Sequence, residues 1–536
     1  MASAVGWILL TVFAAFHQPD RAAARDVGDI ASGDKPMGAA ASPVGVEERA
    51  STTEHMLTID GVEVHYRATA GTLILREEDG APKASIFFVS YERDDVADPG
   101  ERPVSFAFNG GPGSSSVWLH LGVLGPRRAL MDRDGHPLPP PYELVDNPHS
   151  ILDVSDLVMI DPVTTGFSRA APGEDGSAFH GLEEDIEAVG DFIRLWTSRR
   201  GRWASPKFLI GESYGTTRAA GLSKYLQGRH GMYLSGLVLV SSILDFQTVI
   251  FAGHNDLPYP LILPTYAASA WYHGALEPDL QAEPLRSVLD EVEAFALGDY
   301  AAALLQGRRL GDEEEQEMAA RLARYTGLDA DYILSNRLRV PIQRFCTELL
   351  RSERRVVGRL DSRILGPTED AESQGLSYDP SYAAILGPYT ATLNDYLRRE
   401  LAYESDLPYE ILTERVYPWS FETFEGRYVF VADRLHQAMV QNRNLKVFVA
   451  NGYYDLATPY FATEHTFDHL GLDESLWPNV SMAYYEAGHM MYIHEASLAA
   501  MRDDLTAFYA DAVDADAVDP GDDGAPVPGA SPGSGH

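Results

Sequence analysis

Short apolar runs alternate with helical stretches between residues 157 and 240, and this alternation constrains the fold more than any other feature. The runs at 157–160, 207–210 and 237–240 have the length and aliphatic content of buried strands. Helical stretches cover 182–199 and begin again near Tyr214. This order predicts a largely parallel sheet with helices on both faces.

A β-rich segment precedes the alternation. Turn residues separate four runs that predict strands, at 62–66, 72–75, 85–91 and 104–108. From 244 to 434 Ala, Leu, Glu and Arg dominate and the strand pattern stops. Two strands and a final helix then follow, at 445–450, 480–485 and 495–509. We therefore predict an α/β core made of 54–243 and 435–510, with a helical cap inserted at 244–434 that covers a site.

Both ends of the chain differ in composition from this body. An apolar run at 5–16 precedes small residues suited to cleavage after Ala24, so 1–24 is predicted to be a signal peptide and the protein periplasmic or secreted. No Lys or Arg precedes the run, and the alternative is a disordered extension. Residues 25–53 have a linker composition, and 511–536 that of a disordered acidic tail.

The charge balance excludes some classes of partner. The chain has 42 basic and 79 acidic residues, a net charge of −37 and a pI near 4.7. Such a surface repels phosphate backbones and anionic lipid, so we expect neither nucleic-acid binding nor stable membrane association. Cys346 is the single cysteine and cannot form an intramolecular disulfide. The spacing of His489 and His494 matches no metal motif, and no metal or cofactor is predicted.

The sequence F-L-I-G-E-S-Y-G at 208–215 joins an apolar strand to a G-x-S-x-G motif and then to a helix. This is the context of a nucleophile elbow, in which flanking glycines let the chain turn sharply and expose a serine hydroxyl. Ser213 is therefore the candidate nucleophile, and the alternative is a buried structural serine. A hydroxyl needs a neighbouring base and a carboxylate that orients the base.

The candidate acid and base follow the next two strands of the predicted sheet. Asp455 follows the strand at 445–450, and His489 follows the strand at 480–485 after a glycine. Parallel strands collect site residues at their carboxyl ends, and the order serine, acid, histidine is the one expected for such a sheet. We predict that Ser213, Asp455 and His489 form a catalytic triad.

Attack on a carbonyl also needs two amide donors for the developing oxyanion. One is the backbone N–H of Tyr214, the residue after the candidate nucleophile. The glycine-rich sequence N-G-G-P-G at 109–113 follows the predicted strand at 104–108, and Gly111 is the candidate second donor. A simple turn is the alternative, although it would not require three glycines beside a proline.

These motifs resemble those of one family. N-G-G-P-G-S-S at 109–115 and G-E-S-Y-G at 211–215 are similar to signatures of the serine carboxypeptidases, peptidase family S10. Further similar blocks lie at 147–150 and 161–168, and Asp455 and H-M at 489–490 resemble the family's acid and histidine. The resemblance spans roughly 56–509, and the absence of disulfides suggests a bacterial-type branch.

The resemblance implies an α/β-hydrolase fold and the removal of single residues from peptides with a free C-terminus, without a cofactor. It also implies that Asn109 and Glu212 bind the terminal carboxylate. An ionised Glu212 would repel that group, so it should bind when protonated, which favours acidic pH. Two departures are Val123, where the family often carries a glutamate that partners Glu212, and Ser114, where it commonly has cysteine.

Two rival functions remain open from the sequence. The first is another serine hydrolase, namely an esterase, an acyltransferase or a prolyl-type aminopeptidase, against which Asn109 and Glu212 argue. The second is a non-enzymatic protein on a hydrolase fold, against which the complete set of Ser213, Asp455 and His489 argues.

Overall fold

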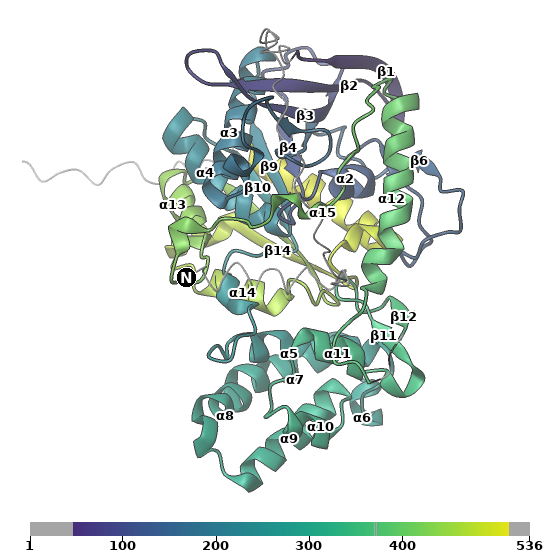
Figure 1. Cartoon of the computed structure of the whole chain (residues 1–536), viewed down its shortest axis with the longest axis vertical. Coiled ribbons are helices and arrows are strands. Elements are labelled where there is room, and N and C mark those ends of the chain that lie inside the picture. The colour runs from purple at the N-terminus through teal and green to yellow at the C-terminus, as the bar shows by residue number, and fades with distance from the viewer. Residues whose placement is uncertain (1–46, 369, 371, 514–536) are drawn as a thin grey trace, which may run out of the picture.

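A mixed, mostly parallel sheet forms the centre of the molecule in the computed structural model, which describes residues 47–368, 370 and 372–513 (Figure 1). Across the sheet the strands are β1 (Ala50–Ile59), β2 (Val62–Arg76), β3 (Pro82–Arg93), β7 (Asp156–Ile160), β4 (Val104–Phe108), β9 (Lys207–Glu212), β10 (Gly236–Val240), β13 (Lys446–Gly452) and β14 (Val480–Tyr485). A short β8 (Arg169–Ala170) pairs with β3. The strands from β7 to β14 are parallel, and β1 to β3 are antiparallel. The predicted fold class is confirmed.

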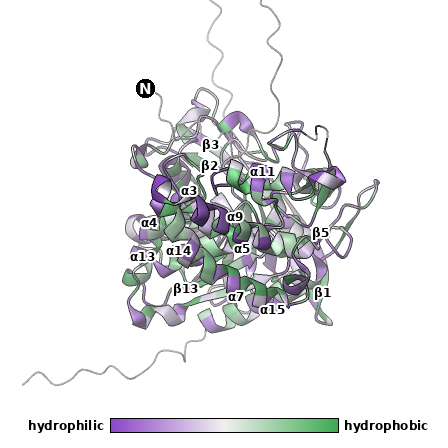
Figure 2. Cartoon of the chain, turned by 90° about the horizontal axis from the view of Figure 1, so that it is seen from below, coloured by the Kyte–Doolittle hydropathy of each residue, from purple (hydrophilic) through white to green (hydrophobic). Residues whose placement is uncertain are grey.

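Helices cover both faces of the sheet because its central strands are apolar on both sides. Along β9, Phe208 and Ile210 pack into one hydrophobic cluster and Leu209 into the other. The first cluster includes residues of α2 (Val117–Leu119), α12 (Pro380–Arg399) and α15 (Glu495–Val513). The second includes residues of α3 (Leu182–Arg199), α4 (Tyr214–His230) and α13 (Ala432–Gln441). Because these helices pack on the sheet, many of them contain both hydrophobic and hydrophilic residues, as the two colours within single helices in Figure 2 show.

The first part of the segment between β10 and β13 forms a second, helical body with its own hydrophobic cluster, drawn in teal below the sheet in Figure 1. Its elements are α5 (Pro258–Tyr272), α6 (Pro278–Gln281), α7 (Leu285–Phe295), α8 (Ala301–Gln306), α9 (Asp312–Thr326), α10 (Ala330–Ser335), α11 (Ile342–Glu348) and the hairpin β11 (Arg355–Val357) and β12 (Leu365–Pro367). Below, "the insertion" means residues 258–367. Tyr454 and Tyr460 from the core belong to the same cluster, so the two bodies share apolar contacts.

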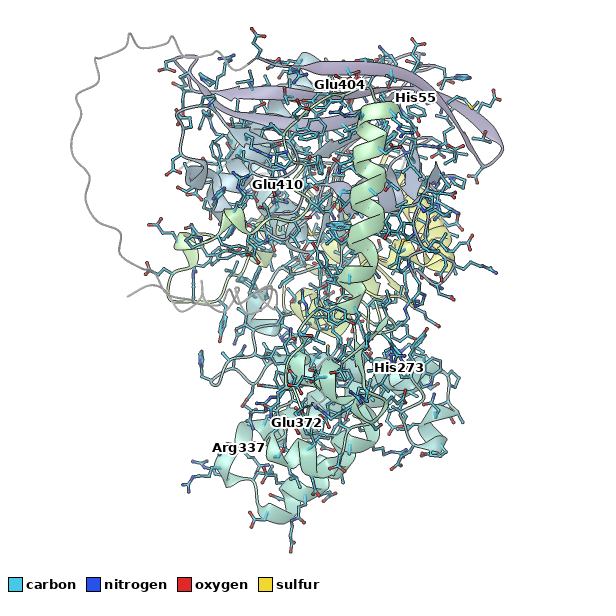
Figure 3. All side chains as sticks on the ribbon, turned by 45° about the vertical axis from the view of Figure 1, so that its right-hand side comes forward. His55, His273, Arg337, Glu372, Glu404 and Glu410 are labelled. Carbon is cyan, nitrogen blue, oxygen red and sulfur yellow. The ribbon has the colours of Figure 1, made fainter. Side chains whose placement is uncertain are left out.

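The later part of the segment at 244–434 returns to the sheet. Helix α12 packs on the sheet face and runs from the insertion toward β1 (Figure 3), with His273 and Glu372 below its lower end and His55 and Glu404 near its upper end. Three further elements complete the described fold: the hairpin β5 (Arg127–Ala129) and β6 (Leu144–Asp146), and α14 (Tyr460–Asp468), which contacts α5.

The folded core extends past its predicted boundary at both ends. The linker expected at 25–53 is too long, because residues 50–53 already pair with β2. This edge strand carries alternating polar residues and few apolar ones, which is why it resembled a linker. Helix α15 continues to Val513, past the boundary expected at 510. The predicted signal peptide at 1–24 and the tail after 513 lie outside the described residues. No helix among the described residues is long and apolar enough to cross a membrane.

Candidate active site

Ser213 occupies a sharp turn between β9 and α4, with φ of 60° and ψ of −128°. A positive φ is costly for a residue with a side chain and persists only where the surroundings enforce it. Here close backbone contact enforces it, because a Cβ on Gly211 would lie 2.3 Å from the carbonyl oxygen of Gly215. A Cβ on Gly215 would lie 2.8 Å from the carbonyl oxygen of Phe108. The two glycines of the G-x-S-x-G motif are therefore needed for packing.

His489 and Asp455 meet beyond the carboxyl ends of β14 and β13. The His489 Nδ1 atom lies 2.8 Å from Asp455 Oδ2. The other oxygen, Asp455 Oδ1, accepts hydrogen bonds of 2.8 and 3.0 Å from the amides of Ala457 and Thr458. The Thr458 hydroxyl donates to Asp455 Oδ2 over 2.6 Å. This carboxylate is fully buried and held in one orientation, which fixes the histidine ring.

The charge state of His489 reflects two opposing effects. Burial acts to lower its pKa, whereas the Asp455 carboxylate raises it through charge and hydrogen bonding, and the net direction is upward from 6.5. Ser213 and His489 line the same cavity, although no hydrogen bond joins them among the described residues. Such contacts are often loose before substrate binds.

The glycine-rich loop at 109–113 lies against this elbow. A Cβ on Gly110 would come within 2.5 Å of the Tyr214 amide nitrogen, so the loop and the start of α4 are in backbone contact. Gly111 has φ of 101°, in the region that favours glycine. In the described part of the chain, the amides of Gly111 and Tyr214 have no hydrogen-bond acceptor.

Asn109 at the start of the glycine-rich loop and Glu212 in the elbow both line this cavity. Burial raises the pKa of Glu212 to about 7, against the opposing influence of His489, of the hydrogen bond from Tyr492 and of the neighbouring Asn109 side chain. The Asn109 Oδ1 atom accepts a hydrogen bond of 3.1 Å from the Leu119 amide, which fixes the orientation of the side chain. Its Nδ2 is buried and has no acceptor of good geometry among the described residues.

A buried ion pair that the sequence did not reveal supports this arrangement. Arg218, on the first turns of α4, donates to Asp185 Oδ2 over 2.7 Å and to the Asn109 carbonyl oxygen over 2.6 Å. The Arg218 side chain is fully buried. It therefore connects α3, α4 and the glycine-rich loop.

The insertion also contacts the site through the loop between β11 and β12, which we call the clamp loop (residues 359–363). Its carbonyl oxygens accept from the amides of Leu456 (3.1 Å, at Arg359) and His489 (2.6 Å, at Leu360), and its Ser362 amide donates to the Tyr454 carbonyl (3.0 Å). These bonds hold the two loops that carry Asp455 and His489. No local motif marks the clamp loop, because its partners lie far away in sequence.

The cavity between the core and the insertion has a volume of about 360 Å³. Its lining combines the predicted site residues with apolar and polar side chains from α2, the insertion, α12 and the loops before and after α12, among them Trp118, Leu360, Leu376, Tyr382, Ile385, Leu412, Tyr417, Arg359, Asp379 and Gln343. Among the described residues no group of His, Cys, Asp and Glu side chains could hold a metal ion.

Comparison with known protein families bears on the resemblance drawn from the sequence motifs. The model of the serine carboxypeptidase family, Peptidase S10, matches residues 63–263. The resemblance to the serine carboxypeptidases is confirmed. The matched segment includes the glycine-rich loop and the elbow, whereas Asp455 and His489 lie beyond it. A search of curated proteins found no match.

One solved carboxypeptidase structure shares the fold, and other solved structures match at lower similarity. Kex1(delta)p, a prohormone-processing carboxypeptidase from Saccharomyces cerevisiae, has a TM-score of 0.50 and 17% identity over 83% of this chain and 92% of its own. A juvenile hormone epoxide hydrolase from Bombyx mori and a thermostable carboxyl esterase from Bacillus coagulans each have a TM-score of 0.34 and 13% identity. They cover 83% and 82% of this chain, and 79% and 98% of their own.

Proposed function

We propose that the protein is a serine-type carboxypeptidase that hydrolyses the C-terminal residue of peptides through an acyl-enzyme intermediate. The observation that carries this proposal is the shared cavity, in which Asn109 and Glu212 lie beside Ser213 and His489. A site for a terminal carboxylate next to a nucleophile selects the last peptide bond. We also propose, from the chain's first residues, that the enzyme acts in the periplasm or outside the cell.

In the proposed reaction, neutral His489 takes the proton of Ser213 Oγ as that oxygen attacks the carbonyl carbon of the last peptide bond. The carbonyl electrons move to its oxygen, which the amides of Gly111 and Tyr214 stabilise. The C–N bond then breaks, and His489 gives its proton to the departing amino acid. A water molecule, deprotonated by His489, attacks the ester carbon, the bond from that carbon to Ser213 Oγ breaks, and His489 returns the proton to Oγ as the shortened peptide leaves.

Recognition of the carboxylate requires donors. The Nδ2 of Asn109, which has no acceptor among the described residues, supplies one, and a protonated Glu212 supplies the other. A carboxylic acid buried in this way remains protonated up to its raised pKa, so it can donate to an anion that an ionised Glu212 would repel. A peptide with an amidated C-terminus loses the charge that both donors bind.

Mass spectrometry of an N-blocked peptide tests the proposal. The peptide is incubated as free acid and as C-terminal amide with the wild type, Ser213→Ala and the matched variant Ser223→Ala. Ser223 is a buried serine on α4 whose hydroxyl donates to the Ala220 carbonyl oxygen of the same helix. We expect stepwise C-terminal loss from the free acid, slower loss from the amide, and no loss with Ser213→Ala. Cleavage of simple esters without shortening of either peptide would instead identify an esterase or acyltransferase.

A further inference from the structure

Glu212 has a hydrogen-bond partner from the far end of the chain. The hydroxyl of Tyr492, which lies in the turn after His489, donates to Glu212 Oε2. Both side chains are buried, at 1% and 3% exposure. The ring has no room to move, because a Cβ on Gly122 would lie 2.2 Å from it. The phenol is therefore fixed against one oxygen of the carboxyl group.

Other groups also face this carboxyl group. The pKa of Glu212 is influenced by His489, Asn109 and Asp455, which lie around the cavity. The charge of Glu212 in turn raises the pKa of Tyr389 on α12. His489 and Asn109 favour the ionised form, as Tyr492 does, whereas Asp455 and above all burial favour the protonated form. The pKa of Glu212 thus results from opposing influences.

The direction of the Tyr492 hydrogen bond decides where that proton lies. A carboxylic acid that accepts a hydrogen bond on Oε2 carries its own proton on Oε1. We propose that Tyr492 is a positioning residue that keeps the Glu212 proton on Oε1, available to the substrate carboxylate, and sets the upper pH limit for recognising a free C-terminus. This inference rests on the proposed carboxypeptidase function.

The same hydrogen bond strengthens when Glu212 ionises, because a phenol binds a carboxylate more strongly than a neutral acid. Tyr492 therefore holds the Glu212 pKa below the value that burial alone would give. Removing the hydroxyl with Tyr492→Phe should keep Glu212 protonated to higher pH. For free-acid peptides the alkaline limb of kcat/KM should then move up by about one pH unit, the size expected for a hydrogen bond to a charged group.

The test measures kcat/KM against pH for one peptide as free acid and as amide. Tyr509→Phe is the matched control, since it also removes one hydroxyl from a buried tyrosine, here bonded to Ser105 on β4. It should leave the alkaline limb unchanged. In a Glu212→Gln background, which has no carboxyl group at this position, Tyr492→Phe should shift neither limb of the pH profile of kcat/KM.

A second variant covers the case in which Tyr492→Phe fails to fold, as judged by its melting curve. Site-specific 3-fluorotyrosine at position 492 keeps the shape of the ring but makes the phenol a stronger donor. The alkaline limb should then move in the opposite direction, to lower pH. The inference would be overturned if a folded Tyr492→Phe protein, or the 3-fluorotyrosine protein, had the same alkaline limb of kcat/KM as the wild type. Wild-type protein that does not shorten free-acid peptides at any pH would instead overturn the proposed function.

Discussion

The carboxylate of Asp361, in the clamp loop of the insertion, accepts a hydrogen bond of 3.2 Å from the backbone amide of Gly488, the residue before His489. Asp361 also forms an ion pair of 2.6 Å with Arg363, and both side chains are at most 6% exposed. Arg363 in turn donates to the Glu486 carbonyl over 3.0 Å. The ion pair thus fixes the loop that carries the proposed base.

Replacing Asp361 by alanine should destabilise the protein and slow acylation. The change leaves the Arg363 cation buried without its partner, which costs about 3–5 kcal/mol in comparable pairs. It also frees the Gly488 amide beside His489. Urea unfolding measures the first effect, and the rate of fluorophosphonate labelling of Ser213 under native conditions measures the second.

Asp279→Ala is the matched control, because it removes an aspartate of the same insertion whose ion pair with Arg324 is exposed. This variant should unfold and react as the wild type does. Equal behaviour of the two variants would mean that the clamp loop does not position His489.

The pH profiles of free-acid and amide peptides should differ on the alkaline side. Burial raises the pKa of Glu212 to about 7, so this group loses its proton as pH rises through that value. Cleavage of a free acid should then decline, whereas cleavage of an amide does not require this proton. On the acid side both should decline, because His489 must be neutral, and its pKa lies above 6.5. Identical alkaline limbs in kcat/KM would contradict the role proposed for Glu212.

Gly110→Ala should disable the elbow without unfolding the core. The added Cβ would lie 2.5 Å from the Tyr214 nitrogen and 2.8 Å from the Glu212 carbonyl oxygen, so the backbone around Ser213 must shift. Displacements of this kind cost about 100-fold in rate, and we expect that loss in kcat/KM. Gly228→Ala on α4 is the control, since a Cβ there meets nothing within 4 Å. It should keep full activity, and a similar loss in both variants would refute the packing argument.

Local pattern was enough to predict much of the fold. The predicted bounds of β4, α3 and β14 match the structure, because each has a strong apolar pattern ended by turn or capping residues. The runs at 62–66 and 72–75 belong to the single strand β2. The intervening small residues suggested a turn, but Gly71 lies there because the backbone at the start of β1 approaches it closely: a Cβ would meet the carbonyl oxygen of Arg49, the residue before β1, at 2.8 Å.

Long-range contacts within the site could not be predicted from the sequence. The positions of Asp455 and His489 after two successive predicted strands were sufficient to identify them as candidates, because parallel strands place the loops at their carboxyl ends along one edge of the sheet. The two side chains do meet in the structure. Tyr492 and Asp361 belong to no motif, and their partners lie far away along the chain. Val123 suggested that Glu212 lacks a partner, and the structure supplies one that is a phenol instead of a carboxyl group.

Replacing Arg218 tests whether the position of the glycine-rich loop depends on the hydrogen bonds of this side chain. Its guanidinium bonds both the Asp185 carboxylate and the Asn109 carbonyl oxygen, a pair of contacts that the single ammonium group of lysine cannot reproduce. Arg218→Lys should therefore loosen the loop that holds Asn109 and Gly111.

We expect this variant to raise KM for the free-acid peptide and to lower kcat for both peptides, each by about ten-fold, because the loop supplies the carboxylate donor and an oxyanion donor. Arg229→Lys, at the exposed end of the same helix, should behave as the wild type. Steady-state kinetics on free acid and amide separate the two effects. A rise in KM for the free acid with unchanged kcat for the amide would mean that Arg218 supports Asn109 alone, and that the Gly111 amide is held by the backbone contact with the elbow.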